Sequence, residues 1–569
     1  MKQTNKLENI LIKLYLILIL VVYPFFFLNN YSDIGNSKNL FYRSATVVFL
    51  FAVCLLPGKM KVDIRSFSKM DDAMILFGVS SILAFVICAD KAVGLNGAYG
   101  WNMGLVTEML MIGTYFVISR KWKPDIRMLY AAGIAAALVF ALGILNRFSI
   151  DPLGMLADLE QEKELLFLST IGQATWYSAF LCVTFPMGLS FFFLEKEKKK
   201  RIAAAAFCII SSATLVTQNS DSAFFALGVV LLVLGWQAFR SYADLARYFE
   251  VLMLISGTFG LVGIMQKVLS QSAVRLDRLS VFFSQSSWIW CVFVLAVGSR
   301  LLLRLSIIRA LLEKMNLILI RNVLYVLIGL TIVALFVFII LNASGLTEEL
   351  LGSSIGRGYF WFDDSWGNNR GFLWKFSMKM YLEEPLVNQL IGVGPDSYVT
   401  RAYQLPEYVL LLRTYGQGMW KDAYVMCAHC EPLNMLICQG ICGLAAFGMI
   451  FVVGIGNALR WFHANSVSDR DDAGRELLDR RMLTYGIALC MVSYLAHNIF
   501  CYSLIVSTPL VFLLAGMGES IQQHLSGTEP AESFHVKKIH FHTGNDKKYL
   551  ESSILYIEYI IKQKTNWRA

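Results

Sequence analysis

The stretch NVLYVLIGLTIVALFVFIILN, residues 322–342, contains no Asp, Glu, Lys or Arg. A helix rises about 1.5 Å per residue, so about 20 apolar residues cross the roughly 30 Å hydrocarbon core of a bilayer. This stretch therefore predicts a transmembrane helix. The composition agrees, because 56% of the 569 residues are hydrophobic, 16% are charged and the mean hydropathy is +0.56. A soluble fold could not bury so much apolar surface.

Similar stretches recur on both sides of this one and predict an all-α integral membrane protein with about 14 transmembrane helices, within a range of roughly 12 to 14. They cover residues 10–28, 44–57, 73–89, 104–119, 128–145, 175–194, 202–218, 222–239, 251–266, 287–303, 322–342, 433–459, 483–500 and 504–517. We expect residues 1–342 to form an N-terminal bundle of about 11 helices and residues 433–518 to add about three. Between them, residues 343–432 predict a large loop with short helices, and residues 519–569 form a polar tail.

Lys and Arg gather in alternate loops between the apolar stretches, for example in residues 59–69, 120–127 and 196–201. Because cytoplasmic loops are enriched in these residues, the pattern places both termini in the cytoplasm and residues 343–432 outside the membrane. The formal net charge of +9 is thus explained by orientation in the bilayer, and we expect no nucleic-acid partner.

The predicted outer loop concentrates aromatic, acidic, amide and arginine side chains, above all in residues 356–374. Aromatic rings stack on sugar rings and carboxylates or amides bind sugar hydroxyls, although a belt of Trp and Tyr at a membrane interface needs no ligand. Arg370 is the leading candidate for binding phosphate, because guanidinium makes paired, charge-assisted hydrogen bonds. The alternative for Arg370 is a solvated or ion-pairing role.

His429 is the one histidine of this loop and directly precedes the next predicted helix. A neutral imidazole there could take the proton of an attacking hydroxyl, and Glu431 could do the same in a buried setting. The alternative for His429 is an ordinary hydrogen-bonding role.

Cys427 and Cys430 form a Cys-x-x-Cys pair beside this histidine. They could form a local disulfide, bind a metal as thiolates or be incidental thiols. No second pair completes a zinc site, so we favour a local disulfide or incidental thiols.

Short motifs follow one another in a fixed order along the chain: two upstream Gly- and aromatic-containing motifs, Arg-x-x-x-Trp, Pro-Leu, Gly-x-Gly-Pro, Ala-His-x-Glu-x-Leu-Asn and Gly-x-x-Gly. From the N-terminus they occupy residues 97–105, 172–177, 370–374, 385–386, 392–395, 428–434 and 440–443. In this order the sequence resembles the O-antigen ligase and O-antigen or capsule polymerase family over about residues 95–515. Members of that family transfer glycans from undecaprenyl pyrophosphate outside the bacterial cytoplasmic membrane.

The resemblance implies an inverting glycosyl transfer, independent of metal or other cofactor, in which an acceptor hydroxyl displaces lipid pyrophosphate. The implied catalytic residues are His429, Arg370 and Glu431, and the implied substrate-binding residues are Trp374, Asn369, Gly394, Asn434, Arg275 and Arg278. Arg275 or Arg278 would replace an outer arginine that many relatives carry where this chain has Asn-Ser-Asp-Ser at residues 219–222. Cys430 stands where the family motif has Asn. The expected partners are an undecaprenyl-pyrophosphate-linked glycan, a lipid or glycan acceptor and the lipid bilayer.

Two other functions fit the same hydropathy. A lipid-linked oligosaccharide flippase would place ionisable residues within helices around a central cavity, whereas this chain concentrates them in the predicted outer loop. A non-catalytic membrane scaffold or sensor is supported only by the polar tail. Within the glycosyltransferase hypothesis, ligase and polymerase differ in their acceptor, and the residues do not distinguish them.

Overall fold

The computed structural model describes residues 2–56, 67–157, 159, 166–351, 360–406, 409, 425–465 and 472–525. The chain up to His524 forms one compact unit. The predicted tail is described only over residues 519–525. Parts of the basic segment at residues 59–69 and of the predicted loop at residues 343–432 also lie outside the described residues.

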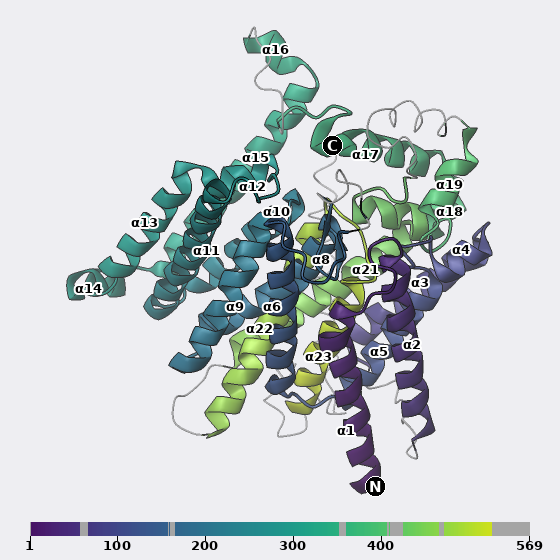
Figure 1. The fold of residues 1–569 in the computed structure, drawn as a ribbon, viewed down its shortest axis with the longest axis horizontal. Coiled ribbons are helices and arrows are strands. Elements are labelled where there is room, and N and C mark those ends of the chain that lie inside the picture. Colours follow the sequence, from purple (N-terminus) through teal and green to yellow (C-terminus); the bar gives the residue numbers. More distant parts are fainter. Residues whose placement is uncertain are drawn as a thin grey trace, which may run out of the picture. The chain divides into compact units, whose positions relative to one another are not determined.

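The described chain is mostly helical (Figure 1). Its first part contains α1 (Lys2–Ile17), η1 (Leu18–Val22), η2 (Tyr23–Phe25), α2 (Ile34–Leu55), α3 (Lys69–Ile87), α4 (Lys91–Asn96), α5 (Leu105–Lys121), α6 (Ile126–Arg147), α8 (Ala174–Leu194), α9 (Lys198–Thr217), α10 (Asp221–Ala238), α11 (Tyr242–Val268), α12 (Arg278–Gln285), α13 (Ser287–Leu302), α14 (Ser306–Lys314) and α15 (Leu317–Ala343). Then follow α16 (Leu346–Leu351), α17 (Trp366–Glu383), α18 (Leu386–Ile391), α19 (Tyr398–Gln404), α21 (Glu431–Ala464), α22 (Asp472–Asn498) and α23 (Thr508–Leu525). A short antiparallel pair, β1 (Phe167–Leu168) with β2 (Gly172–Gln173), precedes α8.

Ten of the described helical segments are long and apolar enough to cross a membrane, and the bent pair α12 and α13 raises this number to 11. The chain is thus a multi-pass helical membrane protein. Each of the predicted apolar stretches coincides with a helix, since the remaining three fall on α5, α22 and α23. Those three do not meet the same length and hydropathy, so the number of about 14 crossings stays a prediction.

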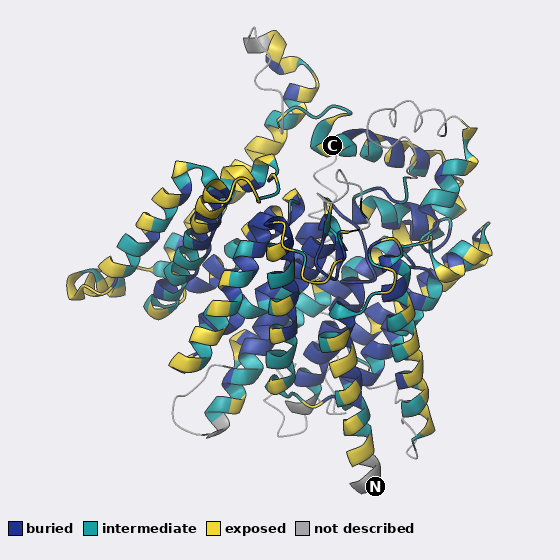
Figure 2. Cartoon of the chain, viewed as in Figure 1, coloured by how far each residue is buried: buried dark blue, intermediate teal, exposed yellow. Residues whose placement is uncertain are grey.

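α23 is buried from Thr508 to Ile521, and α8 and α22, which pack against each other, are also largely buried (Figure 2). α21 packs against both α22 and α3. By contrast, α15 is exposed along almost its whole length, as expected for a very apolar helix whose solvent is lipid. α16 to α19 lie at the opposite end of the bundle from the start of α1 (Figure 1).

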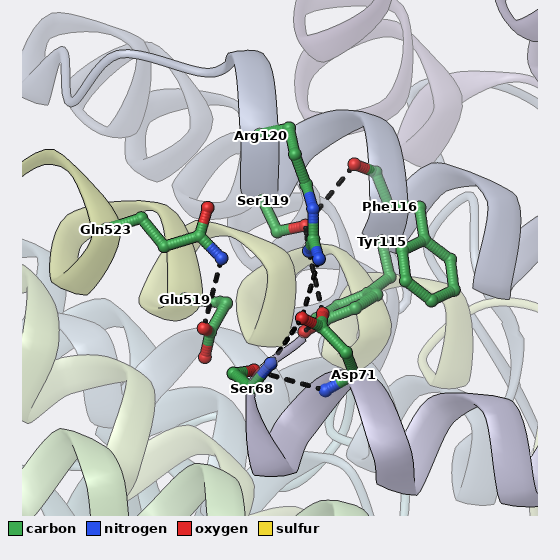
Figure 3. A network of polar contacts seen from close by, with 8 residues as sticks. All are labelled: Ser68, Asp71, Tyr115, Phe116, Ser119, Arg120, Glu519 and Gln523. Carbon is green, nitrogen blue, oxygen red and sulfur yellow. Dashed lines mark hydrogen bonds and ion pairs between the residues drawn. The ribbon is translucent and has the colours of Figure 1, made fainter. Parts of the chain in front are cut away.

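At the other end, a polar network joins α3 to α5 (Figure 3). Asp71 accepts two hydrogen bonds from Arg120, at 2.7 and 2.6 Å, and a third from the Tyr115 hydroxyl at 2.7 Å. Ser68 and Asp71 also form a capping box at the N-terminus of α3. This arrangement satisfies a fully buried carboxylate and fixes where α3 begins.

We expect Asp71→Asn to lower the free energy of unfolding by roughly 3 kcal/mol, because the partly buried Arg120 guanidinium loses its bidentate partner. Thermal unfolding of the purified protein in detergent measures this effect. Asp72→Asn is the matched control: Asp72 occupies the same helical turn but is exposed, so its change should stay within about 0.5 kcal/mol. Equal losses in both variants would contradict the role assigned to the network.

Candidate functional site

Three motif segments that are far apart in the sequence come together beside the N-terminus of α21. Trp176 of the upstream motif meets Trp101 edge-on, with ring centroids 6.0 Å apart. Trp101 in turn stacks on Tyr502 at 5.9 Å, and the Tyr502 ring meets His429 edge-on at 5.1 Å. The segment that precedes α23, residues 499–507, therefore belongs to the site, although no motif pointed to it.

Arg370 is held at the start of α17 by backbone groups. Its Nε donates to the carbonyl of Phe500 at 3.0 Å, and one terminal nitrogen donates to the carbonyl of Gly367 at 2.8 Å. Gly367, Asn368 and Asn369 just before it all have left-handed backbone conformations. Such strain clusters at functional sites, and here it turns the Gly367 carbonyl toward the guanidinium.

Arg370 forms no ion pair within the described part of the chain. Its side chain is half-buried. The two carbonyls orient the guanidinium group and leave its other N–H groups available as donors. An oriented, unpaired guanidinium in a partly dehydrated place is suited to bind an anion.

His429 lies within the electrostatic reach of Arg370. Burial and the positive charge of Arg370 lower the pKa of its imidazole to about 3, so the ring is neutral at physiological pH. Its backbone is left-handed, with φ of 48°. Neither ring nitrogen is hydrogen-bonded to any described residue. A neutral imidazole with free nitrogens can accept a proton from a bound hydroxyl.

Glu431, the competing candidate base, is engaged by the segment before α23. One carboxylate oxygen accepts from the backbone N–H of Ser503 at 2.7 Å and the other from its hydroxyl at 2.6 Å. The side chain is 2% exposed. These bonds attach α21 to the segment that carries Phe500 and Tyr502. Glu431 therefore helps to position the carbonyl that binds Arg370 and the ring that contacts His429.

Some of the proposed substrate-binding residues lie at the site, and others pack elsewhere. Trp374 lies at the site: it stacks on Phe500 with ring centroids 5.9 Å apart, and its buried indole N–H has no partner among the described residues. Asn369 belongs to the left-handed turn that aims Arg370, and the side-chain oxygen of Asn434 is buried and unpartnered in the described chain. Gly394 instead packs inward, because a β-carbon there would come within 2.3 Å of the Cys88 sulfur.

Arg275 and Arg278 are both exposed; Arg275 lies just before α12, and Arg278 is the first residue of that helix. The side chain of Asn219 donates to the Arg275 carbonyl at 3.0 Å and accepts from the Asp277 N–H at 3.1 Å. The segment bearing these arginines therefore lies directly against the turn at residues 219–222. Their contact with a substrate stays a prediction.

The Gly-x-Gly-Pro turn docks into a break in α21. At Gly440 the helix departs from helical geometry, with φ of 66° and ψ of −172°. The carbonyls of Ile437 and Cys438 are therefore free to accept from the N–H groups of Val393 and Gly394, both at 3.0 Å. Through this contact α21 fixes the loop that follows α17 and α18.

We expect Gly440→Ala to destabilise the protein by roughly 3 kcal/mol, because its β-carbon would lie 2.4 Å from the Leu390 backbone and its φ would be strained. Gly448→Ala is the matched control on the same helix, since no atom lies within 4 Å of a β-carbon there. Thermal unfolding should separate the two variants clearly. A Gly440→Ala protein as stable as Gly448→Ala would show that the turn does not depend on the break.

Cys427 and Cys430 are buried free thiols in the structure. Burial raises the pKa of the Cys427 thiol well above its ordinary value and that of Cys430 to about 11. Both therefore stay protonated and are poor metal ligands. Among the described residues, no group of three or more His, Cys, Asp or Glu is placed to hold a metal ion.

Two carboxyl groups near the site were not singled out by the motifs. Asp396 directly follows the Gly-x-Gly-Pro turn and accepts from the N–H groups of Ala98 at 2.8 Å and Met103 at 3.0 Å. Glu108, on α5, accepts from the Gln439 side chain at 2.5 Å. The position of Asp396 directly after a Gly-Pro turn could have identified it from the sequence. Glu108 could not have been identified, because it resembles any polar residue at the start of an apolar helix.

No known family profile and no curated protein matches this sequence. The function is therefore argued from the site itself and from the motifs.

Proposed function

We propose that the protein is a membrane glycosyltransferase that moves a glycan from undecaprenyl pyrophosphate to an acceptor hydroxyl, on the outer side of a bacterial cytoplasmic membrane. One observation carries the proposal: Arg370 is held by two backbone carbonyls, lacks a carboxylate partner in the described chain and lies beside an imidazole that is neutral and has free nitrogens. A diphosphate leaving group and an attacking hydroxyl require this pair of functions.

The roles follow from charge. Pyrophosphate is already a good leaving group, so the main requirement is to stabilise the negative charge that it gains, which Arg370 does with preorganised donors. His429 aligns the acceptor hydroxyl and takes its proton. Trp374 and Phe500 offer a stacked aromatic surface beside Arg370, suited to the apolar face of a sugar.

A transporter of lipid-linked glycans is the second candidate, and one observation favours it. Glu108 is an ionisable residue within a helix, is 3% exposed and lines a cavity, as a transport pathway would require. The two functions differ in their products: transfer forms a new glycosidic bond and releases polyprenyl pyrophosphate, while transport leaves the donor unchanged.

The test is a transfer assay in proteoliposomes with purified protein and an undecaprenyl-pyrophosphate oligosaccharide as the donor. Three acceptors are supplied in turn: a lipid core, a glycan and peptidoglycan. Release of polyprenyl pyrophosphate together with glycan joined to one acceptor would support the proposal and identify the acceptor class. Movement of intact donor between leaflets, with no release under any acceptor, would establish the transporter instead.

A further inference from the structure

A small cavity lined by both apolar and polar side chains lies near His429, between α3, α5, α21 and the segment before α23. Tyr502 forms part of its wall and also meets the His429 ring. Three carboxyl groups line it, one each from α5, from the turn after Gly394 and from α21, together with two amide side chains: Glu108, Asp396, Glu431, Asn434 and Gln439. Three carboxylates within one buried space repel one another, so they cannot all be ionised at once.

Hydrogen bonds show which of the three carries the proton at rest. Glu431 accepts two hydrogen bonds from Ser503, and one oxygen of Asp396 accepts two from backbone N–H groups. Such bonds stabilise the ionised form. Glu108 accepts only from Gln439, and its other oxygen is buried without a partner among the described residues. A charge on that oxygen would be uncompensated, so the resting proton belongs to Glu108.

Both hydrogen bonds that Asp396 accepts from described residues reach the same carboxylate oxygen, so its other oxygen can take up a proton, whereas both oxygens of Glu431 accept from Ser503. Burial raises the pKa of Asp396 to about 7, against the opposing effects of the two backbone N–H groups and of Arg43 on α2. The other titratable groups that face this region are Glu108, Glu431, the thiols of Cys88, Cys427 and Cys438, the Tyr502 hydroxyl, His429 and Arg370. The cation that acts directly on the Asp396 carboxyl is Arg43.

We propose that this cavity receives the proton released by glycan transfer, with Asp396 as the accepting group. The inference rests on the proposed function. In the reaction the acceptor O–H bond breaks, a bond forms between the acceptor oxygen and the anomeric carbon, and the bond to lipid pyrophosphate breaks with its electron pair. The proton passes to His429 and then, through a water molecule in the cavity, to Asp396. The weak basicity of His429 makes such an onward acceptor necessary, because the ring does not retain the proton.

The first test needs no turnover. Infrared difference spectra of the purified protein in nanodiscs, recorded between pH 5 and 9, report protonated carboxyl groups directly. We expect a carboxyl band that disappears as the pH rises, with a midpoint near 7, and that shifts when the protein contains carbon-13-labelled aspartate. Asp396→Asn should remove it, and Glu108→Gln should remove a second band that shows no shift with labelled aspartate. Absence of the isotope shift, or persistence of either band in its variant, would overturn the assignment.

The second test couples the cavity to transfer. In the wild-type protein kcat should rise as the pH rises through about 7, because only ionised Asp396 accepts the proton. Asp396→Asn should lower kcat roughly tenfold or more and abolish that rise, while the KM for the donor stays the same. Asp72→Asn, an exposed conservative change, should behave as wild type. A rise that persists in Asp396→Asn would disprove coupling. If the wild-type protein transfers no glycan, the proposed function fails while the spectra still report on the cavity.

Discussion

Arg370→Ala should lower the rate of glycan transfer by about 1,000-fold, which is the effect of removing a preorganised donor to a developing negative charge. The geometry explains why the loss should be so large. The guanidinium is held by the carbonyls of Gly367 and Phe500 before any substrate binds, so its orientation costs nothing during the reaction. Transfer from a synthetic polyprenyl-pyrophosphate donor, measured under single-turnover conditions, gives the rate directly.

The variants around this position separate charge from geometry. Arg370→Lys keeps the positive charge but loses the planar fork, so we expect an intermediate loss of about tenfold to 100-fold. Lys375→Ala removes a cation from the same helix; Lys375 is exposed and pairs with Asp364 at 2.9 Å. It should transfer glycan at the wild-type rate. A folded Arg370→Ala protein with full activity would falsify the role assigned to Arg370.

The positions of the helices could be predicted from the sequence because apolar length alone decides which segments enter a bilayer. The start of α2 could not. Its first turns carry Asn36, Ser37 and Lys38, which are typical of a loop, yet Lys38 is fully buried. Its ammonium donates to the carbonyls of Tyr23 and Pro24 at 3.1 and 2.8 Å, at the end of the preceding helical segment. Sequence composition does not reveal a buried cation that donates to backbone carbonyls.

The candidate site was predictable to the extent that motifs mark side chains. Arg370, Trp374 and His429 were identified in this way, and the structure brings them to one region. The partners that orient them were not identified, because the groups involved are the carbonyl of Phe500 and the ring of Tyr502, in a segment without a motif. Backbone carbonyls carry no sequence information, and contacts between residues far apart in the sequence depend on packing rather than local pattern.

His429→Gln should lower glycan transfer by about 100-fold or more, as expected when a positioned proton acceptor is lost. The same substitution should make the protein more resistant to acid. In the folded protein the pKa of His429 is about 3, whereas in the unfolded chain it is near 6.5. Below about pH 6.5 the unfolded state therefore binds a proton that the folded state excludes, and stability falls as the pH falls toward 3. Glutamine has no such proton to bind.

The size of this acid effect follows from the two values. At pH 5 the excluded proton costs the folded wild-type protein about 2 kcal/mol relative to pH 7.5. Thermal unfolding at both pH values should therefore show a smaller loss of stability in His429→Gln than in wild type. An equal loss in both proteins would mean that His429 is not held neutral by burial and by Arg370.

The link to Arg370 has a consequence for the order of events in transfer. Burial and the charge of Arg370 both lower the pKa of His429, and in the proposed reaction a bound pyrophosphate would neutralise that charge. Binding of the donor would therefore make the imidazole a stronger base, so that the acceptor hydroxyl is activated more readily when a leaving group is in place. For the same reason Arg370→Ala should raise the pKa of His429, and its stability should then depend less on acid than that of the wild type.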